Sequence, residues 1–207
     1  LRVDSFTVTE WSLSLSISKE VEEMTELGGI VGVDRNLRNL TVGNEQSATQ
    51  YDLNKALEIL ENTRSITRSF KRNDPRIRKQ ITGKYGRRRK QRILQQLHPI
   101  SKHVVEEAFN NRHGIVFEDI REIRRLYRKG NKRGAWCRGR MNSWPFHELK
   151  RQVEYKAAWL GVPVITLSKS ETRGTSVTCF QCGERLQESR TVKRKLWCQT
   201  CRTMFDR

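Results

Sequence analysis

The 207-residue sequence predicts a mixed α/β fold with a small metal-binding unit near its C-terminal end. Short apolar segments typical of β-strands are followed along the chain by segments with the 3.6-residue period of helices. Four of the five cysteines form two Cys-x-x-Cys pairs close to the C-terminal end. Lys and Arg number 41 against 23 Asp and Glu, a net charge of +18. This excess indicates a polyanionic partner, and nucleic acid is the strongest candidate.

The predicted strands begin near the N-terminal end. Residues 6–18 alternate apolar and polar side chains, which predicts one or two strands with one buried face. An acidic, polar stretch over residues 19–28 is expected to lead into the next unit. Strands are then expected at residues 29–34 and 39–44, joined by a turn from Asn36 to Arg38 and followed by a shorter strand from Ala48 to Asp52.

Helical spacing follows these strands. The first helix is expected to begin with Asp52 or Asn54 as its N-cap. In Asn73-Asp74-Pro75, Asp74 is a suitable cap and Pro75 a suitable first helical residue. Helical periodicity resumes at Ile93 and continues after Pro99 as far as Ala108. A further amphipathic helix is predicted over residues 144–160, ending at Gly161.

Two further apolar strands are predicted in the second half of the chain. The first, residues 114–117, ends in Glu118 and Asp119, and the second, a buried strand, spans residues 162–167. Successive side chains of a strand point to opposite faces, so Glu118 and Asp119 cannot both face one site.

Basic residues concentrate in two segments of the sequence. Between Arg64 and Arg92 the only acid is Asp74. A helix face of one charge sign repels itself unless an anionic partner neutralises it, so this segment predicts a nucleic-acid contact. The second segment, residues 121–140, combines Arg and Lys with three glycines and predicts a mobile loop beside Glu118.

Asp34 is a candidate site residue because it ends an apolar run. Residues 29–33 form this run, and burying a carboxylate at its end is costly unless the group is paired or binds a metal. The alternative is a turn aspartate that hydrogen-bonds the nearby backbone. The stretch alone leaves both interpretations open, although Glu118 ends a second apolar run in the same way.

The cysteine spacing predicts a structural zinc site. Cys179-x-x-Cys182 and Cys198-x-x-Cys201 are fifteen residues apart, which is the spacing of a zinc ribbon. Four thiolates complete a tetrahedral shell and leave no open position for catalysis. The fifth cysteine, Cys137, is expected to be a free thiol. This pattern favours a reducing compartment, and with no secretory signal or membrane-spanning run the expected location is the cytoplasm.

Several of these features occur in the order found in one family. Gly29-Ile30-Val31-Gly32-Val33-Asp34 with Asn39-Leu40 resembles the first RuvC-like motif of the TnpB family of insertion-sequence nucleases, relatives of the type V CRISPR effectors. Residues 115–120 resemble the second motif. Residues 144–161, followed by Thr175-Ser176 and the first cysteine pair, resemble the third. The resemblance covers residues 28–207.

The resemblance implies an RNase H-like (RuvC-like) mixed sheet flanked by helices, with the zinc ribbon inserted before the last catalytic acid. Acids at strand ends would hold two Mg²⁺ ions for phosphodiester hydrolysis. By position these are Asp34 and Glu118, with Asp206 or an acid beyond residue 207 as the third. The implied domains are a remnant of a wedge-type domain at 1–20, the nuclease domain at 21–174 and the ribbon at 175–207.

The predicted function is a metal-dependent DNA endonuclease domain of an RNA-guided, transposon-associated protein. Its expected partners are DNA and a guide RNA, with no membrane and no obligate protein partner. The alternative is a noncatalytic zinc-ribbon module that binds DNA or RNA as an accessory or regulator of transposition. Basic charge fits both functions, since phosphate contacts give affinity without sequence choice. The acids favour the nuclease, because uncompensated anions beside bound phosphates repel nucleic acid.

Overall fold

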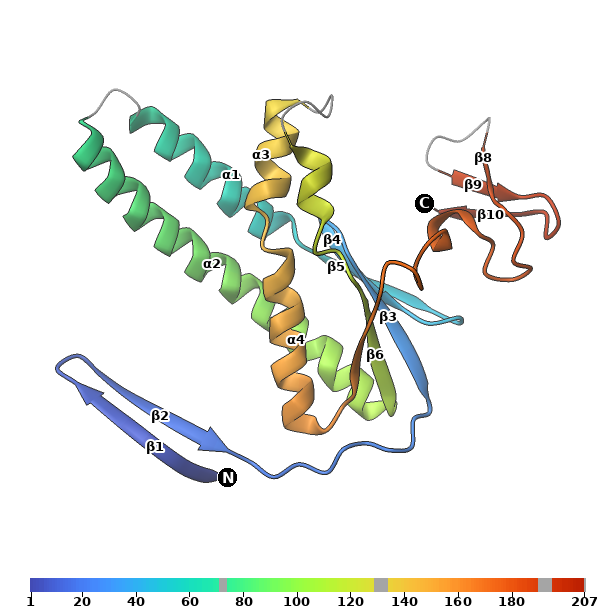
Figure 1. Cartoon of the computed structure of the whole chain (residues 1–207), viewed down its shortest axis with the longest axis horizontal. Coiled ribbons are helices and arrows are strands. Elements are labelled where there is room, and N and C mark those ends of the chain that lie inside the picture. Colours follow the sequence, from blue (N-terminus) through green and yellow to red (C-terminus); the bar gives the residue numbers. More distant parts are fainter. Residues whose placement is uncertain (71–73, 129–133, 190–194, 207) are drawn as a thin grey trace. The chain divides into compact units, whose positions relative to one another are not determined.

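The structure is a computed structural model that describes residues 1–70, 74–128, 134–189 and 195–206 (Figure 1). Parts of both predicted basic segments, including Lys71, Arg72 and Gly130, therefore lie outside the described residues.

The chain divides into two compact units. The first comprises Leu1–Phe117 and Arg121–Thr166, and the second comprises Glu118–Ile120 and Leu167–Arg207. The first unit contains the α/β fold with most of its sheet, and the second contains both cysteine pairs.

A five-stranded mixed sheet confirms the predicted α/β class. Its strands run in the order β5-β4-β3-β6-β7. β3 pairs antiparallel with β4 and parallel with β6, and β4 pairs antiparallel with β5. The strand bounds are β3 (Gly29–Arg35), β4 (Asn39–Gly43), β5 (Ala48–Asp52), β6 (His113–Glu118) and β7 (Val164–Leu167).

One face of this sheet is buried because apolar residues alternate along its strands. In β4 Leu40 and Val42 are buried, and in β6 Ile115 and Phe117 are fully buried. In β3 the buried residue is Val33, the register partner of Phe117. The prediction that the last strand is buried is wrong, because β7 has an exposed centre in which Ile165 keeps 50% of its surface. Edge strands lack a neighbour on one side, and β7 is the edge of this sheet.

Four α-helices belong to the first unit. They are α1 (Asn54–Ser69), α2 (Pro75–Asn110), α3 (Ala135–Ser143) and α4 (Phe146–Leu160). The N-cap of α1 is Leu53, so the expectation of Asp52 or Asn54 as the cap is wrong, although the Asp52 side chain accepts a hydrogen bond from the Asn54 N–H at 2.9 Å. Asp74 caps α2 by accepting from the Arg76 N–H at 2.7 Å, as predicted. α4 ends at Gly161, whose φ of +72° is the left-handed conformation that glycine adopts readily.

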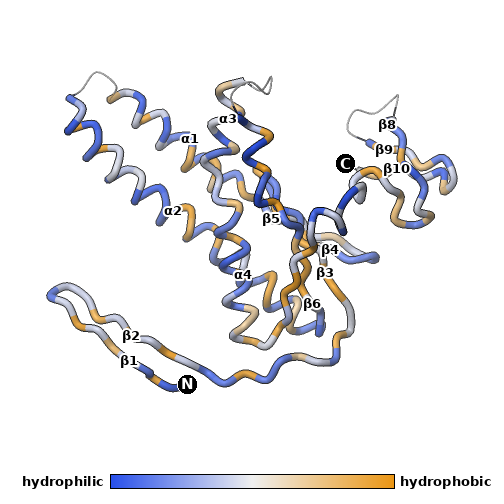
Figure 2. The backbone as a smooth tube through the Cα atoms, in the orientation of Figure 1, coloured by the Kyte–Doolittle hydropathy of each residue, from blue (hydrophilic) through white to orange (hydrophobic). Residues whose placement is uncertain are grey.

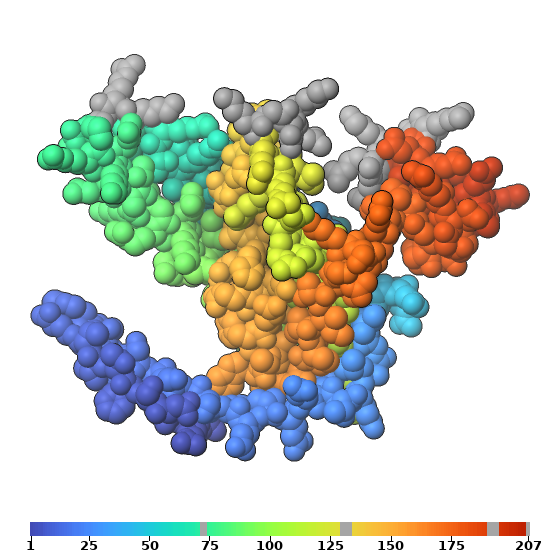
Figure 3. All heavy atoms as spheres, viewed as in Figure 1, coloured from blue at the N-terminus to red at the C-terminus, as the bar shows by residue number. Residues whose placement is uncertain are grey.

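Helices α1, α2 and α4 pack against one another through apolar side chains. α2 contacts both α1 and α4, and Figure 2 shows apolar positions along the parts of these helices that meet (the same elements are drawn as spheres in Figure 3). The most deeply buried apolar side chains of the three helices are Ala56, Leu60, Leu97, Val104, Val105, Ala108, Val153 and Ala157. This cluster is the core of the first unit.

The structure shows where Pro99 lies and corrects the expectation of a mobile loop in the second basic segment. Pro99 lies inside α2, which continues unbroken to Asn110. A proline removes one backbone hydrogen bond, and buried contacts on both sides of it, at Leu97 and Ser101, hold the helix together. The second basic segment is not simply a loop, since the 3₁₀ helix η2 (Ile123–Tyr127) and α3 occupy much of it.

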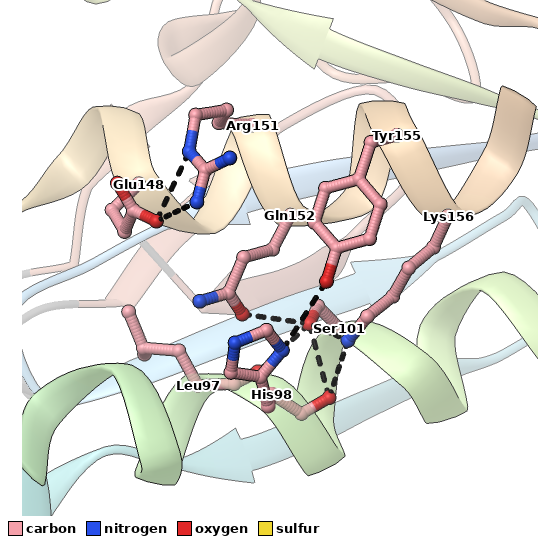
Figure 4. A network of polar contacts seen from close by, with 8 residues as sticks. All are labelled: Leu97, His98, Ser101, Glu148, Arg151, Gln152, Tyr155 and Lys156. Carbon is pink, nitrogen blue, oxygen red and sulfur yellow. Dashed lines mark hydrogen bonds and ion pairs between the residues drawn. The ribbon is translucent and has the colours of Figure 1, made fainter. Parts of the chain in front are cut away.

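Polar contacts also fix α4 against α2 (Figure 4). Ser101 is fully buried, and its hydroxyl donates to the Gln152 side-chain oxygen at 2.9 Å. Lys156 Nζ donates to Ser101 Oγ and to the His98 carbonyl oxygen, each at 2.7 Å. Burial lowers the Lys156 pKa, and Lys102 lowers it further by charge repulsion. These contacts set the position of α4 along α2.

The N-terminal strands form a hairpin that differs from the prediction. β1 (Arg2–Thr9) and β2 (Ser12–Ser18) pair antiparallel, but every residue of both strands is exposed. The expected buried face is therefore wrong. The apolar residues nevertheless occupy facing positions, in the pairs Val3 with Ile17, Phe6 with Leu15 and Val8 with Leu13. A two-stranded hairpin has no second layer, so alternation alone does not bury a face.

The second unit contains a small antiparallel sheet in the order β10-β9-β8. Its strands are β8 (Gln187–Glu188), β9 (Lys195–Cys198) and β10 (Thr203–Asp206), preceded by the 3₁₀ turn η3 (Thr175–Val177).

Candidate metal centres

The structure brings the four cysteines of the two Cys-x-x-Cys pairs together. Their Sγ atoms all lie within 4.8 Å of one another. Sγ of Cys179 is 3.8 Å from that of Cys201, and Sγ of Cys182 is 3.4 Å from that of Cys198. In a tetrahedral zinc site with Zn–S bonds of about 2.3 Å, neighbouring sulfur atoms are about 3.8 Å apart. The cluster is therefore compatible with one zinc ion. Cys137 belongs to α3, outside this cluster.

Both cysteine turns contain a residue in the left-handed backbone conformation. The residue after each second cysteine has positive φ, +75° at Gly183 and +52° at Arg202. In the first turn the Gly183 N–H donates to the Cys179 carbonyl at 2.8 Å, and in the second the Cys201 N–H donates to Cys198 Sγ at 3.4 Å. A left-handed residue reverses the chain so that both thiols of a pair point to one side. Glycine at 183 accomplishes this without strain, whereas Arg202 adopts a conformation that costs a non-glycine residue about 1 kcal/mol.

The thiols show the electrostatics of a cation site. Burial raises the pKa of Cys179, but hydrogen bonds from the backbone N–H groups of Cys182 and Gln181 outweigh it and lower the pKa to about 7. The hydrogen bond with Cys182, followed by burial, raises the pKa of Cys201 to about 12. Several thiolates this close repel one another, so a bound cation is needed to ionise all four. Metal binding here would therefore release protons.

Asp34 lies one residue before the end of β3 and is exposed. The Asn36 side-chain amide donates to Asp34 Oδ2 at 2.8 Å. After this bond, the Asp34 carboxylate keeps two acceptor positions, Oδ1 and the second lone pair of Oδ2. Asn36 was expected only as a turn residue, and its spacing of two residues from the acid is the signal that sequence reasoning overlooked.

The other predicted acids belong to the second unit. Glu118 is the last residue of β6 and is exposed. Asp119 follows it, and its backbone N–H donates to the Leu167 carbonyl at 3.0 Å. Asp206 is the last residue of β10, and its partner in the backbone register of β9 is Lys195. Glu118 and Asp206 are thus the last residues of their strands, whereas Asp34 is followed by Arg35 within β3 and Asp119 lies just outside β6.

The first basic segment forms exposed surface of α1 and α2. The exposed cations of its described part are Arg68, Arg76, Arg78, Lys79, Lys84, Arg87, Arg88, Lys90 and Arg92. The only acid between Arg64 and Arg92 is Asp74, and its side chain is engaged at the helix cap. This basic surface can bind an anionic polymer through its phosphates.

Comparison with known proteins identifies the family. The chain is 32% identical over 198 residues to the TnpB-like protein MJ0751 of Methanocaldococcus jannaschii, an alignment that covers 91% of this chain and 68% of the relative. The chain belongs to the TnpB family. A family model described as Cas12f1-like, TNB domain, matches residues 146–207, the part of this TnpB-family chain that includes all four clustered cysteines.

Solved structures agree with this family at the level of the fold. A CRISPR-Cas12f ternary complex matches 94% of the TnpB-family chain with a TM-score of 0.60 and 16% identity. A Cas12f1-sgRNA-target DNA complex matches 84% of it with a TM-score of 0.57, also at 16% identity. The chain spans 39% and 35% of the lengths of these two proteins.

The helices were also tested for membrane-spanning character. Within the described residues, every helix is too short or too polar to cross a bilayer.

Proposed function

We propose that this TnpB-family chain is the nuclease part of an RNA-guided protein that cleaves DNA with bound Mg²⁺, and that its sheet is RNase H-like. The observation that carries the proposal is the register of β3 and β6. Val33 pairs with Phe117, and each of these buried residues is followed directly by an acid, Asp34 and Glu118.

The proposal assigns these two acids to the same face of the sheet, by the alternation of side chains along each strand. Side chains alternate along a strand, and both Val33 and Phe117 occupy the covered face. Asp34 and Glu118 therefore belong to the opposite face, and both are exposed. In this proposal the two carboxylates share a divalent ion.

The chemistry of these donors suits Mg²⁺, which prefers carboxylate oxygens and bound water to nitrogen or sulfur ligands. Two such ions supply an activated water and stabilise the leaving oxygen in phosphodiester hydrolysis. The protein's part is to orient the ligands, and Asn36 does so for Asp34 through its hydrogen bond. The third ligand in the proposal is Asp206 or an acid beyond residue 207. Extending the chain with its natural C-terminal residues and measuring Mg²⁺ affinity distinguishes the two.

The proposed partners are DNA and a guide RNA. The exposed cations of α1 and α2 supply the backbone-binding surface for such polyanions. Support comes from the fold match to a protein whose structure is described as a complex with sgRNA and target DNA. In RNA-guided recognition the base pairs read the sequence while the protein holds backbone and shape.

The remaining parts of the chain receive structural roles in this proposal. One Zn²⁺ held by Cys179, Cys182, Cys198 and Cys201 would organise the second unit without entering the reaction. The β1–β2 hairpin is proposed to be the remnant of a wedge-type domain, which fits its exposed apolar face. The proposed domain limits are residues 1–20, 21–174 and 175–207.

Cleavage of single-stranded and nicked DNA in Mg²⁺ tests the proposal. The wild-type chain and Asp34→Ala are compared, with Glu45→Ala as a control because Glu45 is an exposed acid on the β4–β5 turn, at the other end of β4 from the β3–β4 turn. We expect Asp34→Ala to lose cleavage while it keeps its affinity for DNA, and Glu45→Ala to behave as wild type. Equal cleavage by wild type and Asp34→Ala rules out the assigned site. Binding without cleavage in every variant favours the noncatalytic module.

A further inference from the structure

Arg35 occupies an unusual place for an arginine. It is the last residue of β3, directly after Asp34, and it lies two residues from the buried Val33. Because strand side chains alternate, Arg35 shares the covered face of the sheet with Val33, whereas Asp34 belongs to the opposite face. A cation at an end of the covered face requires partners that compensate for lost water.

Two partners of Arg35 come from two other elements of the first unit. Its Nη1 donates to the backbone carbonyl oxygen of Phe146, in the first turn of α4, at 3.2 Å. Its Cζ lies 5.1 Å from the centre of the Phe117 ring, within the range of a cation–π contact. The guanidinium thus joins the end of β3 to β6 and to α4.

Both partner residues are buried. Phe117 is fully buried and Phe146 is 5% exposed. The space beside Arg35 is nearly filled: the cavity there has a volume of about 10 Å³ and is lined by Leu53, Leu97, Trp144, Phe146 and Leu149, together with Asn36 and Pro145. α4 is itself fixed to α2 by the Ser101 and Gln152 hydrogen bond. Arg35 is therefore held from outside its own strand.

We propose that Arg35 is a positioning residue that holds Asp34 in place for metal binding, an inference that rests on the proposed function. Arg35 and Asp34 share a peptide bond, so anchoring the guanidinium restrains the direction of the Asp34 side chain. Phe117 precedes Glu118 in the same way. The Arg35 side chain thereby holds the end of β3, which bears Asp34, against Phe117, the residue before Glu118.

An apolar replacement separates positioning from simple stability. In Arg35→Met the side chain keeps an unbranched apolar stem but loses the guanidinium, and with it the hydrogen bond and the cation–π contact. Arg35→Lys keeps the charge but lacks the planar fork that can stack and donate at once. Arg38→Met is the matched control, because Arg38 is an exposed arginine of the same β3–β4 turn.

The readout is Mn²⁺ affinity, measured by electron paramagnetic resonance on the full chain and corrected for the folded fraction from thermal unfolding. Supporting residues of a metal site typically change affinity 10- to 100-fold. Because Arg35 acts through the backbone, we expect Arg35→Met to weaken Mn²⁺ binding about tenfold. Arg35→Lys should fall between Arg35→Met and wild type, Arg38→Met should match wild type, and Asp34→Ala should lose binding. Wild-type affinity in Arg35→Met overturns the proposal.

Hydrogen exchange separates a failure of this inference from a failure of the proposed function. If wild type and Asp34→Ala bind Mn²⁺ equally, the metal site is refuted, and Arg35 is then judged by the amide exchange rates of Asp34 and Asn36. Exchange at least tenfold faster in Arg35→Met, with no change in Arg38→Met, supports a positioning role. Unchanged exchange at both amides overturns it.

Discussion

The two units of this chain are stabilised by different means. In the first unit Leu60, Val104 and Val153 lie among many fully buried apolar side chains of helices and sheet. In the described part of the second unit, the buried apolar residues are Cys179, Leu196 and Cys198, two of which belong to the cysteine cluster. A segment this small rarely folds on hydrophobic burial alone. The comparison shows that the shorter unit has a cluster of four cysteines where the larger unit has an apolar core.

Removal of the metal is expected to have the largest effect on the difference in stability between the two units. Structural zinc sites contribute roughly 10–16 kcal/mol of binding free energy, which is also folding free energy. A strong chelator, or the variant Cys198→Ser, should therefore unfold residues 167–207 and leave the α/β unit intact. Amide exchange resolved by residue measures this. Cys137→Ser is the control, since Cys137 lies in α3 outside the cluster. Protection of Leu196 that survives chelation contradicts the proposed metal dependence.

A core truncation tests the contrast in the opposite direction. Leu60 of α1 is fully buried, and Leu→Ala changes at such sites cost about 2–5 kcal/mol. Leu60→Ala should lower the free energy of unfolding of the first unit by this amount and leave metal content unchanged. Denaturant unfolding and elemental analysis provide the two measurements. The control is Leu126→Ala, because Leu126 is 64% exposed. Loss of zinc in Leu60→Ala indicates that the two units fold together.

The smallest expected effect on the free energy of unfolding comes from the ion pair between Glu148 and Arg151 of α4. The hydrogen bond with Arg151 is the main cause that lowers the Glu148 pKa from its usual 4.5. A carboxyl group with a lowered pKa stabilises the fold above its unfolded pKa and loses this contribution as pH falls through the folded pKa. Exposed pairs of this spacing contribute about 0.3–0.5 kcal/mol.

Glu148→Gln measures this contribution directly. Its free energy of unfolding should lie about 0.3–0.5 kcal/mol below that of wild type at pH 7 and converge with it as the pH falls through the lowered pKa of Glu148. Glu58→Gln serves as a control because Glu58 is an exposed acid of α1. A difference between wild type and Glu148→Gln that is independent of pH excludes the ion pair as its source.

Local patterns in the sequence were enough to predict many elements. The strands of the five-stranded sheet, the Asp74 cap of α2 and the end of α4 at Gly161 were expected from spacing and from residue type. These features depend on neighbours a few residues apart, so the sequence alone determines them. The cysteine spacing likewise predicted the cluster, because only the turns and one short sheet need to form.

Other features depended on contacts between distant residues. Alternation in the hairpin could not reveal that its apolar face is exposed, since burial requires a second layer. Pro99 is tolerated in α2 because packing on both sides outweighs the lost hydrogen bond.

The candidate site shows the same division between sequence and tertiary structure. The sequence identified Asp34 and Glu118 as acids that end apolar runs. The register that makes Val33 and Phe117 neighbours comes only from the pairing of β3 with β6. The hydrogen bond from Arg35 to the Phe146 carbonyl likewise depends on the packing of α4. Parallel pairing joins residues more than eighty positions apart in the chain, and such contacts leave no local periodic signal. The sequence therefore determined which acids are candidates, and the tertiary structure decided the register of β3 against β6 and the contacts of Arg35.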